Sequence, residues 1–139
     1  MFEKLLVASD GSDGAFKALT AAVHLAKRYR VELHMVCVEE MPRFPATVDE
    51  VVEETTEAGR QFDAVVERAV AAAKLQRVKL LAHVMPGHTV PTIVDFIRRE
   101  RFDLLVVGFM GHSALYNRVI GGTTDRLVEL APCSVLVVK

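Results

Sequence analysis

The chain has 139 residues, of which 51% are hydrophobic and 25% are charged, and its formal net charge is -1. This composition predicts one compact domain, residues 1–139, and argues against disorder. The balance of 17 basic and 18 acidic residues provides no field of one sign, so neither nucleic acid nor an anionic membrane is an expected partner.

The start of the chain and its cysteines indicate a cytoplasmic protein. The first apolar stretch is too short for a signal peptide, and no apolar run approaches the ~18 residues of a membrane span. Cys37 and Cys133 lie far apart inside apolar runs, which indicates small buried residues in a reducing compartment. The five histidines show no paired ligand spacing, so no metal site is predicted.

Short runs rich in Val and Leu alternate with amphipathic helical patterns along the chain. The predicted strands are residues 4–9, 31–38, 79–84, 103–108 and 134–138. Apolar residues at helical spacing predict helices over 15–26, 62–73 and 90–97, and a shorter one over 123–130. Strict alternation predicts an α/β fold with helices on both faces of a parallel sheet, because parallel neighbours require crossover connections.

Two long connections follow the carboxyl ends of predicted strands. Residues 39–47 follow the second strand, and residues 109–122 follow the fourth. Ligands of open α/β sheets bind beyond these strand ends, where the strand order reverses. Both connections are therefore expected at the functional edge of the sheet.

Four of the eight glycines gather in the connection after the fourth strand: Gly108, Gly111, Gly121 and Gly122. Glycine lets backbone approach an anion closely, and a following helix N-terminus offers unpaired N–H groups. The segment is either a phosphate cradle or a set of ordinary strand-end, turn and helix-entry glycines. Spacing alone does not decide between these two interpretations. Neither a Walker P-loop nor the fingerprint G-x-G-x-x-G is present.

The pattern G-x-x-G-x9-G formed by Gly108, Gly111 and Gly121 resembles the universal stress protein family, whose nucleotide-binding members carry G-x-x-G-x9-G-[ST]. The opening LLVASDGSDGAFKAL, the segment HVMPGHTVPTIVDFIRRERFDLLVVG and the ending APCSVLVV are similar to further parts of that family. The resemblance implies a single doubly wound, five-stranded parallel sheet with strand order 3-2-1-4-5. The ends of the first and fourth strands would then lie side by side.

The same resemblance implies a site for an adenine nucleotide. Its expected contacts to adenine and ribose are Ala8, Ser9, Asp10 and Val38, and its expected contacts to ribose and phosphates are Val107, Gly108, Gly111, Gly121, Gly122 and Thr123. His112 could face phosphate, although a solvated loop position is the alternative, and Asp10 could instead be a turn or capping residue. ATP is the expected ligand, with AMP or ADP as alternatives, and Asp10 and Asp13 are candidates to hold a phosphate-bound Mg²⁺.

The chain departs from the nucleotide-binding motif at Gly122, where those members carry Ser or Thr. One hydroxyl donor to phosphate is therefore missing. Such a hydrogen bond is worth ~1.5–3 kcal/mol, which corresponds to roughly one to two powers of ten in affinity. Thr123 or Thr124 could supply the donor instead.

These observations predict an adenine-nucleotide-binding module for stress response or signalling. It is expected to form a homodimer through Ser134–Val138, an apolar strand at the edge of the implied sheet. The alternatives are a dimeric interaction protein of the same fold that holds no nucleotide, and a slow ATP hydrolase. Because no placed general base or nucleophile emerges, no catalytic residue is predicted.

Overall fold

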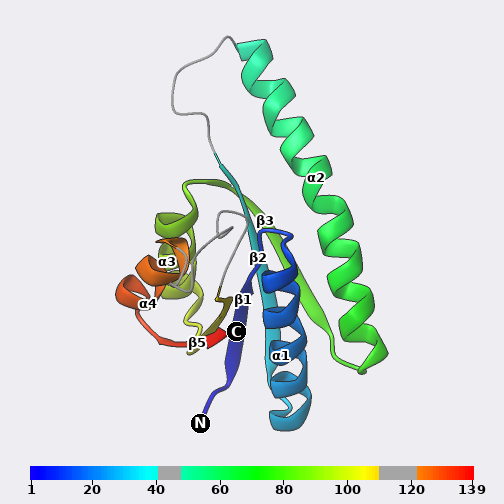
Figure 1. Cartoon of the computed structure of the whole chain (residues 1–139), viewed down its shortest axis with the longest axis vertical. Helices are drawn as coiled ribbons and strands as arrows, with labels where there is room; N and C mark the ends of the chain where they lie inside the picture. The colour runs from blue at the N-terminus through cyan, green and yellow to red at the C-terminus, as the bar shows by residue number, and fades with distance from the viewer. Residues whose placement is uncertain (41–47, 110–121) are drawn as a thin grey trace.

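A computed structural model describes residues 1–40, 48–109 and 122–139, with the side chains of 48–59 and 61 left aside. Strands and helices alternate strictly over these ranges (Figure 1). The strands are β1 (Lys4–Ala8), β2 (Glu32–Glu40), β3 (Leu80–Gly87), β4 (Leu104–Gly108) and β5 (Ser134–Val138). The helices are α1 (Asp13–Tyr29), α2 (Val48–Leu75), α3 (Thr89–Glu100) and α4 (Gly122–Leu130).

The five strands form one parallel sheet in the order β3-β2-β1-β4-β5. This confirms the strand order and the fold that the sequence led us to expect. The order reverses at β1, which pairs with β2 on one side and with β4 on the other. The carboxyl ends of β1 and β4 therefore adjoin at the switch point of the sheet.

Alternate residues of the strands supply two separate cores. Leu5 and Val7 of β1 belong to the core beneath α1 and α2, whereas Leu6 belongs to the core beneath α3 and α4. Figure 1 shows the corresponding layers, with α1 and α2 on one side of the sheet and α3 and α4 on the other. Because both faces are covered, the buried positions of the central strands are apolar apart from His34 of β2, as is typical of parallel sheets.

Two strands extend beyond their predicted ends. β2 and β3 remain paired as far as Glu40 and Gly87, so β2 is two residues longer and β3 three residues longer at its end than expected. Pro86 is compatible with this pairing because β3 is an edge strand, where a missing N–H can face outward. α2 begins at Val48, well before the predicted start, and Val70 of its predicted apolar stripe is 39% exposed.

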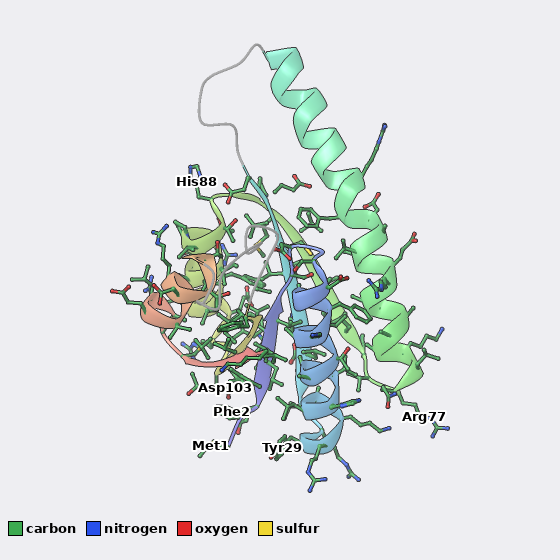
Figure 2. All side chains as sticks on the ribbon, in the orientation of Figure 1. Met1, Phe2, Tyr29, Arg77, His88 and Asp103 are labelled. Carbon is green, nitrogen blue, oxygen red and sulfur yellow. The ribbon has the colours of Figure 1, made fainter. Side chains whose placement is uncertain are left out.

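The side chains labelled in Figure 2 include residues at both ends of the sheet. His88, which follows β3, lies at the carboxyl end, and Phe2 and Asp103 lie at the amino end. None of the helices in the described part of the chain is long and apolar enough to cross a membrane. Because ligands of open α/β sheets bind beyond the carboxyl ends of the strands, we expect the predicted site at the end of the sheet where His88 lies.

Candidate functional site

The turn between β1 and α1 is held by short side chains that bond to nearby backbone. The Ser12 hydroxyl accepts a hydrogen bond from Ala15 N–H at 3.1 Å and caps α1, while Asp10 Oδ1 accepts one from Ser12 N–H at 3.0 Å. Ser9 Oγ accepts from Gly11 N–H at 3.2 Å. Asp10 therefore does have the turn role considered from the sequence. That role is compatible with a ribose contact, because a carboxylate offers about four acceptor positions.

Gly11 gives this turn its shape. Its φ of +83° lies in the left-handed region, which an L side chain rarely adopts. A Cβ atom at Gly11 would also lie 3.0 Å from Cγ2 of Val65 on α2. The turn is thus fitted closely between the sheet edge and α2, and this fixes where Asp10 is presented.

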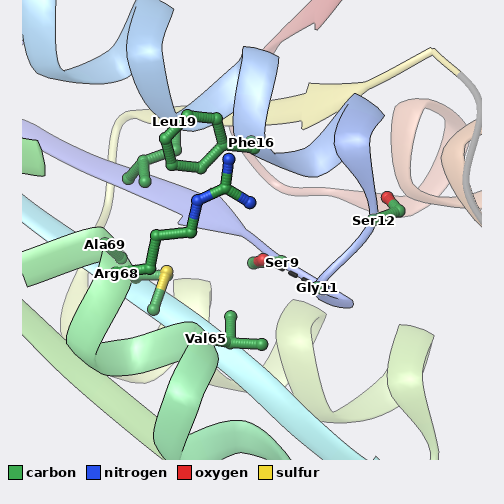
Figure 3. Close-up of a pocket in the computed structure, with 9 residues that line it drawn as sticks. Ser9, Gly11, Ser12, Phe16, Leu19, Val65, Arg68 and Ala69 are labelled. Atoms are coloured by element: carbon green, nitrogen blue, oxygen red, sulfur yellow. Dashed lines mark hydrogen bonds between the residues drawn. The ribbon is translucent and has the colours of Figure 1, made fainter.

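A small cavity lies behind the turn, between α1 and α2 (Figure 3). It is partly open, with about 280 Å³ of empty space when the adjoining solvent is included, and Ser9 and Met35 are among its lining residues. The guanidinium carbon of Arg68 lies 3.7 Å from the centre of the Phe16 ring, so the cation stacks on the aromatic face at the cavity wall. The cavity is on the α1–α2 side of the sheet, opposite the side that Val38 and Val107 face.

An apolar wall forms on the α3–α4 side of the same edge. Val38 at the end of β2 and Val107 at the end of β4 are 9% and 3% exposed and belong to one core cluster, against which the half-buried Ala8 packs. These three residues, which the sequence assigned to the neighbourhood of a base and ribose, are therefore brought together by three adjacent strands. Apolar walls of this kind suit the face of a flat ring.

Gly108 at the end of β4 is required by close packing. A Cβ atom there would lie 2.7 Å from the carbonyl oxygen of Gly14, which is backbone of the first turn of α1. The Gly108 carbonyl also accepts a 2.8 Å hydrogen bond from the buried hydroxyl of Thr124 on α4. Gly108 thus joins β4 to the N-terminal ends of both α1 and α4.

The N-terminus of α4 lies at the hydrogen bond between Thr124 and Gly108. The Thr124 hydroxyl already donates its proton to the Gly108 carbonyl. The neighbouring hydroxyl of exposed Thr123 is therefore the one that could donate to phosphate. A Cβ atom on exposed Gly122 would meet no atom of the described residues within 4 Å. Gly111, His112 and Gly121 lie outside the described residues.

Glu40 is a residue at this edge that the sequence did not single out. Its carboxylate accepts hydrogen bonds from the backbone N–H of Thr89, at 3.0 Å, and from the Thr89 hydroxyl, and it lies 3.5 Å from Nδ1 of His88. His88 occupies the N-cap of α3 without making a side-chain capping bond. Glu40 therefore caps α3 from the neighbouring strand, a contact that local sequence patterns cannot reveal because it spans 49 positions.

Removing this cap should destabilise the protein modestly. We expect Glu40→Ala to lower the free energy of unfolding at pH 7 by about 0.5–1 kcal/mol, the lower part of the range for caps, because Glu40 is exposed. The Thr89 hydroxyl, opposed by burial, holds the pKa of Glu40 below its ordinary value of 4.5. The stabilisation is therefore present above pH 4.5 and is lost as the pH falls through the lower pKa of the folded state.

Urea denaturation at several pH values would measure this effect, with Glu39→Ala on the same strand as the matched control. A difference between Glu40→Ala and wild type that grew toward pH 3 would contradict the capping role.

The two free cysteines lie in different parts of the sheet, Cys37 near the carboxyl end of β2 and Cys133 just before β5. Burial, followed by the charge of Asp10, raises the pKa of the Cys37 thiol to about 12, so this cysteine is an inert buried residue, as predicted. Cys133 is only partly buried, and burial likewise raises its pKa. Over residues 1–40, 48–109 and 122–139, no three His, Cys, Asp or Glu side chains are grouped so that they could hold a metal ion.

The fold and the carboxyl edge of the sheet together define the class of protein. It is a doubly wound α/β protein whose strand order reverses beside a polar turn, an apolar wall and a helix N-terminus. The family model of the universal stress protein family matches residues 1–139, so the chain belongs to that family. Universal stress protein YxiE of Bacillus subtilis is 30% identical to this chain over the full length of both proteins. The solved structure of universal stress protein UspA from Lactobacillus plantarum has a TM-score of 0.87 and 29% identity, and covers 99% of this chain and 98% of its own.

Three further solved structures share the fold and are described as nucleotide complexes. A universal stress protein in complex with cAMP has a TM-score of 0.77 and 23% identity, and covers 99% of this chain and 97% of its own. A family member from Arabidopsis thaliana with AMP bound has a TM-score of 0.70 and 18% identity, with 99% and 91% covered. The protein from Archaeoglobus fulgidus in complex with dAMP has a TM-score of 0.69 and 21% identity, with 99% and 98% covered.

Proposed function

We propose that this protein binds an adenine nucleotide at the carboxyl ends of β1 and β4 and acts as a stress-response or signalling module. The observation that carries the proposal is the convergence, at one sheet edge, of the Asp10 turn, the Val38–Val107 wall and the N-terminus of α4. Each part suits a different portion of a nucleotide: a carboxylate suits the ribose hydroxyls, an apolar wall suits the base, and a helix N-terminus suits the phosphates.

The nucleotides named for the three structural neighbours support the adenine base. All three complexes contain an adenine nucleotide with a single phosphate, namely cAMP, AMP or dAMP. ATP remains our proposed ligand because the glycines of the G-x-x-G-x9-G pattern would present backbone to further phosphates. Mg²⁺ bound through those phosphates would lie near Asp10 and Asp13, the two acidic residues of the β1–α1 region.

The nature of the ligand can be established on the purified protein. We expect mass spectrometry of the supernatant after denaturation to detect an adenine nucleotide in stoichiometric amount, or titration calorimetry of nucleotide-free protein to detect ATP binding. Absence of a released nucleotide together with no binding of ATP, ADP or AMP would support the alternative, an interaction protein without nucleotide.

Gly122 offers a test of phosphate contact in which the fold is preserved. Because a side chain at Gly122 meets no atom of the described part of the chain within 4 Å, Gly122→Ser should be accommodated without strain. The added hydroxyl should tighten ATP by roughly tenfold to a hundredfold and leave AMP nearly unchanged, since it would address the distal phosphates.

Titration calorimetry of ATP and AMP would measure both affinities, with Gly122→Ala as the matched control that adds the Cβ atom without the hydroxyl. Equal effects of serine on ATP and AMP, or a gain that alanine reproduces, would contradict a phosphate contact at this position.

We further propose a cytoplasmic homodimer that pairs through β5. β5 is an outer strand of the sheet, and apolar Leu136 on it is 38% exposed. Antiparallel pairing of two β5 strands across a two-fold axis would satisfy both backbone edges and cover these side chains. A charge at position 136 should oppose that pairing.

Light scattering coupled to gel filtration would therefore show Leu136→Lys shifted toward monomer relative to a dimeric wild type. Leu75→Lys, at the 85% exposed end of α2, is the control and should leave the mass unchanged. A monomeric wild type at high concentration would overturn the proposed dimer.

A further inference from the structure

A chain of three titratable side chains joins β2 to β3 on the α3 side of the sheet, away from the proposed nucleotide site. His34 is 7% exposed, and its Nδ1 lies 2.7 Å from Nε2 of His83. The other ring nitrogen of His34, Nε2, contacts Oε1 of Glu32. Because His83 pairs in register with Val36, the two histidines are diagonal neighbours on one face of adjacent strands, so their side chains can meet.

Aromatic rings confine this histidine pair. The two imidazoles are nearly parallel, at 5°, with centroids 5.0 Å apart. Phe102 packs edge-on against His34 at 5.0 Å, and Phe96 of α3 packs edge-on against His83 at 4.9 Å. Phe96 and Phe102 are both buried, so each imidazole has a core aromatic ring against it.

The bonding pattern fixes where the protons lie in the uncharged pair. A carboxylate accepts hydrogen bonds only, so His34 Nε2 carries the proton that faces Glu32. In a neutral His34 the remaining nitrogen, Nδ1, is then an acceptor, and His83 Nε2 must carry the proton between the rings. His83 Nδ1 is the one position left for an added proton.

Added protons therefore have unequal consequences. A first proton on His83 Nδ1 leaves the His83 Nε2–H donor and the inter-ring hydrogen bond intact. A second proton must go to His34 Nδ1, where two N–H groups would face each other across 2.7 Å. Both rings then carry a positive charge, one on buried His34 and one on partly buried His83, so the hydrogen bond is replaced by repulsion.

We propose that the His34–His83 pair is an acid-sensitive latch that holds edge strand β3 to β2 at neutral pH and releases it when both rings are protonated. The charged groups around the latch come from each neighbouring element. Glu100 at the end of α3 favours a proton on His83, whereas Lys4 on β1 opposes it. Lys4 and Lys79 also lower the pKa of Glu32 on β2, which keeps that carboxylate ionised beside His34. Lys4 and the burial thus work against a positive charge on His83.

The direction of the pH effect follows from His83. Burial, followed by the charge of His34, lowers the pKa of His83 below its ordinary value of 6.5. Between pH 6.5 and that lower pKa the unfolded chain binds more protons than the folded protein, so stability falls as the pH falls through this window. Glu32, whose pKa is lowered chiefly by its hydrogen bond to His34, contributes a separate loss below pH 4.5. Measurements between pH 7.5 and 5 therefore keep the contribution of His83 to stability separate from that of Glu32.

The test compares wild type with His83→Gln. A glutamine amide can donate to His34 Nδ1 as His83 Nε2–H does, but it does not titrate. The melting temperature of wild type should fall by several degrees from pH 7.5 to 5, and that of His83→Gln should fall much less. His24→Gln, at an exposed position on α1, is the control and should behave as wild type.

Hydrogen exchange and NMR on the wild-type protein test the proposal even if His83→Gln fails to fold. From pH 7.5 to 5, protection of the β3 amides relative to the β1 amides should fall roughly tenfold after correction for intrinsic exchange. In NMR the His83 imidazole should titrate below its ordinary pKa of 6.5. Equal pH dependence in wild type and His83→Gln, or a His83 ring whose pKa is not lowered, would overturn the latch.

Discussion

Gly108→Ala should lower the free energy of unfolding by roughly 1–3 kcal/mol, the range for groups forced into well-packed sites. The added Cβ atom would lie 2.7 Å from a backbone oxygen of Gly14, and backbone cannot turn aside as a flexible side chain can. β4 and the first turn of α1 would have to separate, which would also shift the carbonyl that Thr124 holds. Nucleotide affinity should fall together with stability.

Chemical denaturation would measure this loss, with Gly122→Ala as the matched control. The control adds the same methyl group where it meets none of the described residues within 4 Å. If Gly108→Ala were as stable as Gly122→Ala, the close approach of β4 to α1 would be contradicted.

Gly111→Val and Gly121→Val should each abolish detectable ATP binding while leaving the fold intact. In the proposed cradle a branched side chain would occupy the position of a phosphate. Both glycines lie outside the described residues, so the expectation rests on the G-x-x-G-x9-G pattern. Titration calorimetry would measure the affinity, and circular dichroism would report the fold. Unchanged ATP affinity in both variants would mean that these glycines serve only the path of the chain.

The fold could be predicted from the sequence because its strongest signals are local and repeated. The Val- and Leu-rich strands are buried on both faces, and their alternation with amphipathic helices indicates a parallel sheet. Strand order came from the family resemblance, and β3-β2-β1-β4-β5 confirms it. Strand ends were less accurate. The apolar run predicted an end of β3 at residue 84, but β3 stays paired with β2 through Pro86 and Gly87, which an edge strand allows.

Part of the candidate site could be located from the sequence as well. Ala8, Val38 and Val107 do lie together, and Asp10 does lie in the turn beside them. The roles of Glu40 and Thr124 could not be predicted, because each depends on a partner in another element, 49 and 16 positions away. The His34–His83 pair was missed for the same reason, since only the sheet register brings the two rings together.

Titration calorimetry of the nucleotide-free protein tests the central proposal most directly. ATP and GTP would be compared on wild type and on Asp10→Ala, with Asp95→Ala, at an exposed position on α3, as the acidic control away from the site. We predict saturable binding of ATP near one equivalent per chain, much weaker binding of GTP, and a clear loss of ATP affinity in Asp10→Ala. No heat of binding for ATP, or binding that is equal for GTP and unaffected by Asp10→Ala, would contradict an adenine-nucleotide site at this edge of the sheet.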